Sequence, residues 1–542
     1  MVSSTGQVAD EEAYKRLKEA FVSDHYGSTV WEINKVLFVA PAAVLLWSML
    51  QARKKFFDPY TPLAYFADFL INCGAILFAT TIYSENPAVL NGLVLLPMLF
   101  IQLNHSSAAK SQKTPKKPPT DSHANKKDDD KKDDDKKDDD KNADLEVIDP
   151  LPVKPFVTHY RGAMLVATCI CILAVDFNVF PRRFAKTESL GTSLMDLGVG
   201  SFVFSAGVVS VRQQLKEENG DVPRTSFISK FVGSFRTAIP LLILGFVRLY
   251  SVKKLDYAEH VTEYGVHWNF FFTLAAIGPF VTLFHPLIRL VPSYSIYAII
   301  AYVITLFMEM LFTYSDLLSW VVFAPRDDFI NANKEGIVSI PGYVAIYLTG
   351  QAIGLSILRR DQDPDAAEAE NDLWLAEALG GEEKLKEMKR SHRQFAWINL
   401  AKYGVIFCIL YYFHTGYYGP RLVVSRRFAN MAYCLWVAAF NTVQLWIFCT
   451  VESLFFPDLY QARHKVVEAE RVKRATSKVL KAFNRNGLAI FLLANLLTGL
   501  VNMTMRTIEM GDIPAMAVLG GYSAVLTGTA LALDYVNINI KL

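Results

Sequence analysis

Apolar runs of about 20 residues recur through most of this chain, and each is long enough to cross a bilayer as a helix. A backbone in lipid has to satisfy its own hydrogen bonds, which a helix does within one segment. The windows give about thirteen spans, with approximate cores at 31–50, 63–83, 87–103, 157–177, 190–211, 228–250, 266–288, 294–314, 337–357, 394–414, 428–450, 484–505 and 514–536. The sequence therefore predicts an all-α, polytopic membrane protein.

Composition excludes several other classes of protein. Of the 542 residues, 52% are hydrophobic, and the mean hydropathy is +0.22. A soluble multidomain enzyme and a disordered or fibrous chain do not fit these values. The net charge of +2 comes with scattered basic residues, which argues against a nucleic-acid partner. All six cysteines lie in apolar runs without a CxxC pair, so we expect small buried side chains rather than disulfides or a zinc site.

The spans and the polar segments between them divide the chain into seven parts. The first 28 residues are polar, so we expect the first apolar run to be an uncleaved anchor. The predicted parts are a luminal N-terminal segment (1–30), spans 1–3 (31–103), a disordered charged cytosolic loop (104–156), spans 4–9 with the catalytic core (157–357), a cytosolic loop (358–393), spans 10–13 (394–536) and a cytosolic C-terminus (537–542).

The loop after the third span contains a charge repeat. Between Lys126 and Lys141 the sequence Lys-Lys-Asp-Asp-Asp occurs three times. Such a segment cannot bury enough apolar surface to fold, so the sequence predicts a solvated, disordered loop. The Asp triplets are an alternative cation site, but the interleaved lysines neutralise them, and we predict no metal site.

Basic residues predict the orientation of the chain. The loops on the same side as Arg53–Lys55 hold more Lys and Arg than the loops on the other side, even when the charge repeat is left out. This bias places the first set in the cytosol and the N-terminus outside it. Arg182, Arg183 and Lys186 lie on the non-cytosolic side against this bias. Basic residues in such a position suggest an anionic ligand.

Two ionisable residues flank the loop between the fourth and fifth spans. Asp176 ends one span, Lys186 opens the next, and Pro181 between them breaks the helix. We expect a hairpin whose tip holds the two close together. A carboxylate and an ammonium group there suit acyl transfer to an alcohol, the first as general base and the second as oxyanion stabiliser. A structural ion pair that caps the hairpin is the alternative.

Other polar residues on the same side are candidates for substrate binding. They are Arg182, Arg183, Asp196, Lys253, Lys254, His267 and Asn269. The two arginines have the geometry to bind phosphate, or they anchor the chain at the interface. Lys253 and Lys254 are candidates by charge alone. His267 is a candidate general base or donor to a carbonyl, and its position beside Trp268 equally suits an interface residue.

Two stretches resemble a known family. Residues 176–205 read DFNVFPRRFAKTESLGTSLMDLGVGSFVFS, and residues 254–272 read KLDYAEHVTEYGVHWNFFF. Both closely resemble the glycosylphosphatidylinositol (GPI) inositol acyltransferases of the endoplasmic reticulum, of the fungal GPI-anchored wall protein transfer type. The resemblance implies transfer of palmitoyl from acyl-CoA to the inositol 2-hydroxyl of glucosaminyl-phosphatidylinositol. It also implies that Asp176 and Lys186 are the catalytic pair.

The resemblance carries further expectations. The protein is expected to be multi-pass in the endoplasmic reticulum membrane, with its active site facing the lumen. Acyl-CoA would be a co-substrate, with no tightly bound cofactor. Glucosaminyl-phosphatidylinositol, membrane lipids and the antifungal inhibitors of the family would be the other partners. We further expect a cavity opened by the fourth to eighth spans, with an apolar sleeve for the acyl chain.

Three other functions remain open on the sequence alone. Thirteen spans with ionisable residues also suit a lipid or solute transporter, although no internal repeat is evident. A non-catalytic membrane scaffold is another reading, which the polar residues clustered on one side weakly oppose. A sugar acetyltransferase that acts through a luminal His267 is the third.

Overall fold

The computed structural model describes residues 13–14, 16–18, 20–21, 23, 25–111, 151–223, 225–254, 261–288, 295–360, 396–417, 419–460 and 465–540, without the side chains of 103–111, 251–254 and 261–262. Regular structure in these residues is helical, apart from an isolated β-bridge between Gly27 and Thr192. The predicted all-α class is confirmed. The charge repeat and most of the loop predicted at 358–393 lie outside the described residues.

Twelve membrane-length apolar helices occur in the described residues. Two are composite: α2 (Val30–Leu37) continues into α3 (Val39–Lys54), and α4 (Pro62–Phe69) continues through a π-helical turn (Leu70–Gly74) into α5 (Ala75–Thr80). The others are α8 (Pro155–Ala174), α9 (Leu194–Glu218), α10 (Phe227–Lys254), α12 (Phe270–Ile288), α13 (Ser295–Tyr314), α16 (Lys334–Ile357), α19 (Ala396–Thr415), α20 (Met431–Phe455), α23 (Gly487–Thr504) and α24 (Asp512–Tyr535).

Each of these helices matches one predicted span, and the remaining prediction, the third (87–103), falls on a further helix. Helix α6 (Pro87–Ser111) is apolar only over Pro87–Gln102, because polar residues follow. Short helices occupy the connections: η3 (Arg182–Phe184), α11 (Val261–Tyr264), α14 (Leu317–Phe323), α15 (Phe329–Ala332), α21 (Lys465–Arg474), α22 (Lys478–Arg485) and η4 (Thr507–Glu509).

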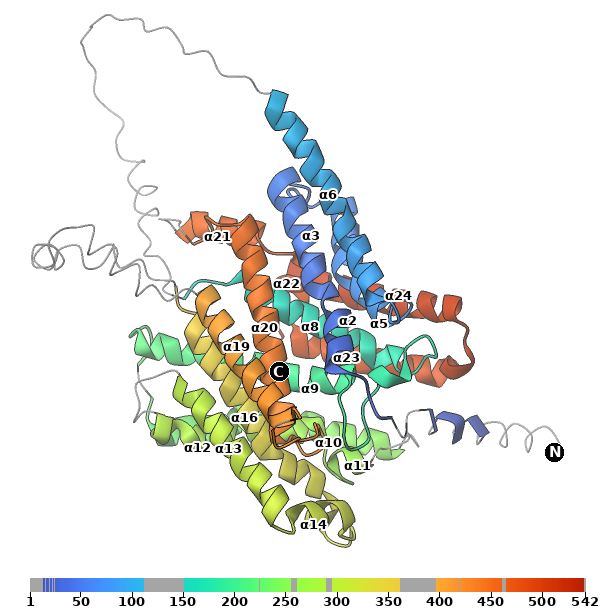
Figure 1. Cartoon of the computed structure of the whole chain (residues 1–542), viewed down its shortest axis with the longest axis vertical. Helices are drawn as coiled ribbons and strands as arrows, with labels where there is room; N and C mark the ends of the chain where they lie inside the picture. The colour runs from blue at the N-terminus through green and yellow to red at the C-terminus, as the bar shows by residue number, and fades with distance from the viewer. Residues whose placement is uncertain are drawn as a thin grey trace, which may run out of the picture.

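A central group of helices forms the core of the bundle. The apolar windows of α8, α16 and α20 are 72–78% buried, whereas that of α10 is 11% buried. Helix α9 packs against α16, and α16 against α20 (Figure 1). Glycines permit the α9–α16 crossing, because a Cβ atom at Gly350 would lie 2.3 Å from the carbonyl oxygen of Phe204.

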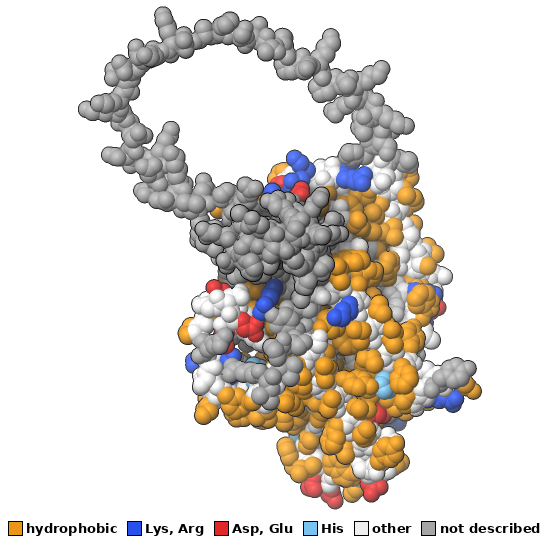
Figure 2. Space-filling view, turned by 60° about the vertical axis from the view of Figure 1, so that its left-hand side comes forward, with side chains coloured by type: hydrophobic (Ala, Val, Ile, Leu, Met, Phe, Trp, Pro, Cys, Tyr) orange, Lys and Arg blue, Asp and Glu red, His pale blue; other side chains and the backbone are white. Residues whose placement is uncertain are grey.

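Hydrophobic side chains cover the outer helices. Ile243 and Phe246 on α10 and Val405 and Ile409 on α19 are exposed. Figure 2 shows hydrophobic side chains over most of the described part of one face, with few charged ones among them. Such a surface suits contact with lipid, which agrees with a multi-pass membrane protein.

Seven connecting segments meet at one end of the bundle, which we call the loop face. It comprises residues 25–29, 81–86, 175–193, 263–269, 315–333, 416–430 and 505–511. Backbone hydrogen bonds join these segments, such as Gly191 N to Val424 O at 2.8 Å and Val266 N to Ala332 O at 2.9 Å. The alternation of predicted spans places these same segments at one end, as the structure does.

Candidate functional site

Asp176 lies on the loop face directly after α8. Its side chain is buried, and its Oδ2 accepts a 2.7 Å hydrogen bond from Nδ2 of Asn502, in the last turns of α23. Oδ1 of Asn502 in turn accepts a 2.8 Å hydrogen bond from Nζ of Lys18, in the segment that precedes the first span. The amide therefore links a buried carboxylate to an ammonium group from the N-terminal segment.

The surroundings of Asp176 change its acidity. Burial raises the pKa of Asp176 above its ordinary value, although Asn502, Lys18 and Arg182 act in the opposite direction. Burial also lowers the pKa of Lys18, while Asp176 raises it. A carboxylate with a raised pKa is a stronger base than an exposed one, which suits proton transfer from a hydroxyl group.

Arg182 uses its guanidinium to close the end of α8. Its Nη1 donates to the carbonyl of Val175 at 2.8 Å, and its Nη2 donates to Phe177 at 3.0 Å and Phe180 at 2.8 Å. The guanidinium also lies 3.8 Å above the ring of Phe21. Burial lowers the pKa of Arg182 to about 10, against the effect of Asp176. These contacts satisfy carbonyls that a helix end leaves free, and they occupy donors that a phosphate would need.

Arg183 points to other partners. Its Nε pairs with Glu32 at 2.7 Å, and its Nη1 pairs with Glu85 at 2.7 Å. Glu32 lies in the first turn of α2, and Glu85 lies in the connection before α6. Arg183 thus joins its own loop to the start of α2 and to the connection before α6, and phosphate binding by this residue stays a prediction.

Lys186 has its own carboxylate partner. Its Nζ lies 2.8 Å from Oε1 and 3.1 Å from Oε2 of Glu263 in α11, with 40% of its side chain exposed. Within the described part of the chain, Lys186 and Asp176 form no ion pair with each other. The buried rings of Phe180 and Phe184 occupy the segment between them. The connection between α8 and α9 is therefore a packed loop, in which Asp176 and Lys186 have different partners.

Lys186 belongs to a closed set of contacts, which we call the charge ring: Lys186, Glu263, Arg426, Asp196 and Thr187. Arg426 pairs through Nη1 with Glu263 at 3.0 Å and through Nε with Asp196 at 2.6 Å. Asp196 Oδ2 accepts from Thr187 N at 3.1 Å and Thr187 Oγ1 at 2.8 Å. Since Thr187 follows Lys186 in the chain, the ring fixes both the backbone and the ammonium group of the lysine.

The buried members of the charge ring keep fixed ionisation states. Arg426 is 2% exposed and Asp196 is 0% exposed. Burial would raise the pKa of Glu263, but Lys186 and Arg426 lower it to about 2. Glu263 and Asp196 raise the pKa of Arg426 far above its usual range, against the effect of burial. Glu263 is therefore an anion at neutral pH and serves to hold cations rather than protons.

A second buried pair lies beside the ring. Glu335, in the first turn of α16, is 0% exposed and accepts from Arg427 Nη2 at 2.8 Å and from Arg326 Nη1 at 3.1 Å. Arg427 also donates to Ser189 Oγ at 3.1 Å. Segment 416–430 is thereby tied to the loop after α8 and to the start of α16.

Of the remaining predicted binding residues, His267 and Asn269 have structural contacts. His267 donates its backbone N–H to Asn333 Oδ1 at 2.8 Å, and its ring stacks with Phe329. Asn269 caps α12 by accepting from Phe271 N at 3.0 Å, and it donates to the Gly245 carbonyl at 2.9 Å. Lys253 and Lys254 end α10, but their side chains lie outside the described part of the structure.

Some of these partners were missed at the level of sequence. Arg426 and Arg427 precede a span on the side predicted to be non-cytosolic, which is the signal that singled out Arg182 and Arg183. Asn502 and Lys18 carry no comparable signal, because a single amide at a span end and one lysine in a polar segment are common.

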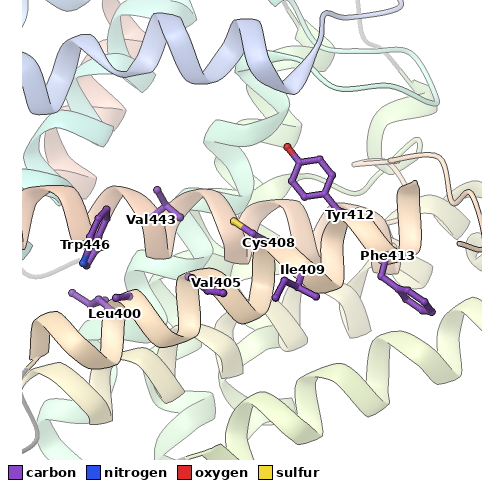
Figure 3. Close-up of a pocket in the computed structure, with 10 residues that line it drawn as sticks. Leu400, Val405, Cys408, Ile409, Tyr412, Phe413, Val443 and Trp446 are labelled. Atoms are coloured by element: carbon purple, nitrogen blue, oxygen red, sulfur yellow. The ribbon is translucent and has the colours of Figure 1, made fainter. Parts of the chain in front are cut away.

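An apolar groove lies away from these charged residues. It has a volume of about 610 Å³ between α19 and α20 and is lined by Leu400, Gly404, Cys408, Tyr412, Val443 and Trp446 (Figure 3). No charged side chain lines it, and it contains none of the predicted site residues. The sleeve expected among the fourth to eighth spans stays a prediction.

All six cysteines are free, and five are buried, as expected for small core side chains. No group of three His, Cys, Asp or Glu side chains in the described residues is arranged to hold a metal ion.

The fold and the loop face together define a class: a multi-pass, all-α membrane protein with buried ionisable residues gathered at one end. The sequence model of the GWT1 family matches residues 14–533, and the chain belongs to that family. The chain is 46% identical to "GPI-anchored wall transfer protein 1" of Gibberella zeae over 98% of its length and all of that protein. The proteins of that name from Aspergillus fumigatus and Saccharomyces cerevisiae are 46% and 37% identical, over 97% of this chain and 99% of each relative. The family resemblance in residues 176–205 and 254–272 is confirmed.

Proposed function

We propose that this protein is an acyltransferase of GPI-anchor biosynthesis. It moves a palmitoyl group from acyl-CoA to the inositol 2-hydroxyl of glucosaminyl-phosphatidylinositol. Family membership and the names of the relatives support a role in GPI-anchor formation. The observation that supports this chemistry is the buried carboxylate of Asp176, which follows the C-terminal end of α8 and has a raised pKa.

The proposed reaction uses two side chains. Asp176 accepts the proton of the inositol hydroxyl while the hydroxyl oxygen attacks the thioester carbonyl. The oxyanion that forms is stabilised by the ammonium group of Lys186. As the tetrahedral intermediate collapses, the carbon–sulfur bond breaks and the ester remains. Asp176 returns its proton to the departing CoA thiolate.

The separation of the two residues supports this division of roles. A direct ion pair with Lys186 would lower the pKa of Asp176 and weaken it as a base. Asp176 instead meets a neutral amide, and Lys186 is held by Glu263 with part of its side chain exposed. The charge ring positions the ammonium group without neutralising the base.

The proposed location is the endoplasmic reticulum membrane, with the loop face toward the lumen. The bias of Lys and Arg toward the opposite loops supports this orientation. Acyl-CoA, glucosaminyl-phosphatidylinositol, membrane lipids and the antifungal inhibitors of the family are the proposed partners. We propose neither a nucleic-acid partner nor a tightly bound cofactor.

A microsome assay with labelled palmitoyl-CoA and glucosaminyl-phosphatidylinositol tests the proposal. Acylated lipid is expected from the wild type and from Glu509→Gln, a control carboxylate that is exposed on the same face. None is expected from Asp176→Asn, and Lys186→Ala is expected to be severely impaired. Product from Asp176→Asn would move the base elsewhere, with His267 tested next. No product from inserted wild type would favour the transporter.

A further inference from the structure

Helix α8 leaves one narrow stripe incompletely covered. Most of its residues are buried, and none is fully exposed. The partly covered ones are Arg161, Met164, Ala167, Thr168 and Ile172, and Val175 continues the row after the helix. Their spacing of three or four residues puts them on one face of the helix. The row ends beside Asp176, so a partly covered face of α8, which we call the path, leads from Arg161 to the proposed base.

Arg161 is the one charged residue on this stripe. It lies inside a membrane span, where a guanidinium is costly unless it is paired. Its Nε is buried without a hydrogen-bond partner, and no ion pair of Arg161 occurs among the described residues. Other arginines near this end are satisfied: Arg212 donates to the carbonyl of Leu151, and Arg485 pairs with Asp534. An unpaired guanidinium in this position is suited to an anion that arrives from outside the chain.

The sides of the path are apolar. Gly198 of α9 faces Thr168, since a Cβ atom added there would lie 3.8 Å from Thr168 Oγ1. Four residues farther along α9, Phe202 packs against Phe491 of α23, with their ring centroids 6.1 Å apart. A ligand on this path would therefore meet a cation at one end, a carboxylate at the other and mainly apolar side chains between them.

Length identifies the kind of ligand. From Arg161 to Asp176 the helix rises about 22 Å, at 1.5 Å per residue. In CoA, thirteen bonds separate the thioester sulfur from the nearer phosphorus of the diphosphate, which is about 15 Å when extended. The second phosphate and the contact distances at the two ends cover the remaining distance. A thioester at Asp176 thus places the diphosphate near Arg161.

We propose that Arg161 binds the diphosphate of the acyl-CoA donor, with the pantetheine arm laid along the stripe of α8. This inference rests on the proposed acyltransferase function. It assigns Arg161 to donor binding and not to the chemistry, because it lies at the end of the path away from Asp176.

Two donors separate this role from a structural one. Palmitoyl-CoA carries the diphosphate, and palmitoyl-pantetheine has the same thioester without a phosphate. Arg161→Gln is expected to raise KM for palmitoyl-CoA roughly tenfold to a hundredfold. Its kcat/KM for palmitoyl-pantetheine should match that of the wild type, and Arg161→Lys should keep part of the preference for CoA. Arg236→Gln, an exposed arginine within α10, is the control and should leave both donors unaffected.

Three outcomes would overturn the proposal. Equal losses with both donors would mean that Arg161 supports the fold. A raised KM for glucosaminyl-phosphatidylinositol alone would assign the arginine to a lipid phosphate. An unchanged KM for palmitoyl-CoA would mean that the diphosphate binds elsewhere. Failure of the proposed function itself looks different, because wild-type protein would then transfer palmitoyl from neither donor.

Protein stability gives an independent reading. Because Arg161 has no described ion-pair partner, its removal does not leave another buried charge unpaired. Arg161→Gln should therefore unfold at the same temperature as the wild type or higher. A lower unfolding temperature would point to a structural role. Palmitoyl-CoA should raise the unfolding temperature of the wild type more than that of Arg161→Gln.

Discussion

Asn502 donates a 2.7 Å hydrogen bond to the carboxylate of Asp176, and the two residues are 326 positions apart in the chain. The same amide accepts from Lys18 at 2.8 Å. The environment of the proposed base is thus assembled from the N-terminal segment, the end of α8 and the end of α23. Its acidity depends on side chains that are remote in sequence.

Replacement of Asn502 should change the pH dependence of the reaction. Asn502→Asp removes the donor and adds a negative charge, and both effects raise the pKa of Asp176. Since the base must be deprotonated, the acidic limb of the kcat/KM profile should move to higher pH by about one unit or more. Asn502→Ala should move it less, in the same direction. A uniform loss of activity at every pH would contradict this role.

Asp176→Asn should make the protein more stable while it abolishes transfer. The folded-state pKa of Asp176 is raised, so the ionised form opposes folding. This destabilisation is absent at a pH below the pKa of Asp176 in the unfolded chain. It is complete at a pH above the pKa of Asp176 in the folded protein. At neutral pH the variant should unfold roughly 1–3 °C higher in detergent, and the difference should shrink as pH falls. A less stable variant would mean that the carboxylate is structural.

The pair of Arg426 and Asp196 should show strong energetic coupling. Arg426→Met leaves a fully buried carboxylate with one fewer partner, which costs about 3–5 kcal/mol. Asp196→Asn on the same background should cost much less than it does alone, with a coupling of about 1–3 kcal/mol. The exposed pair Arg506 and Glu509, 3.5 Å apart, is the control and should couple by less than about 1 kcal/mol. Additive effects at Arg426 and Asp196 would show that their contact contributes little.

The α9–α16 crossing should tolerate no side chain at Gly350. A Cβ atom there would lie 2.3 Å from a backbone oxygen of Phe204, so Gly350→Ala must push the helices apart. We expect a loss of about 1–3 kcal/mol or more in stability. Gly528→Ala on α24, where a Cβ atom would meet nothing within 4 Å, should be neutral or slightly stabilising. Equal effects at the two glycines would contradict the close approach.

The helices were accessible from the sequence because each span is encoded locally. The hydropathy of a segment indicates whether it lies in lipid or in water. A single segment in lipid forms a helix because only a helix satisfies its backbone hydrogen bonds within the segment. The third predicted span, 87–103, coincides with the apolar part of α6, Pro87–Gln102. The same alternation of spans placed Asp176, Lys186 and His267 at one end of the bundle.

The contact partners of Asp176 and Lys186 could not be predicted from the sequence. Proximity in the chain suggested a pair between Asp176 and Lys186, but the buried rings of Phe180 and Phe184 occupy that segment. The actual partners, Asn502 and Glu263, lie in segments that only tertiary packing brings near. Hydrophobic periodicity carries no information about which polar groups meet.

The separation of Asp176 and Asn502 in the chain also determines the order in which the two residues are synthesised. A ribosome adds about 5–20 residues per second, so Asn502 is made roughly 16–65 s after Asp176. During that interval the end of α8 is already synthesised, while the amide that completes its surroundings does not yet exist. The site is therefore among the last parts of the protein to mature, and a chain that stops before α23 carries the proposed base without its partner.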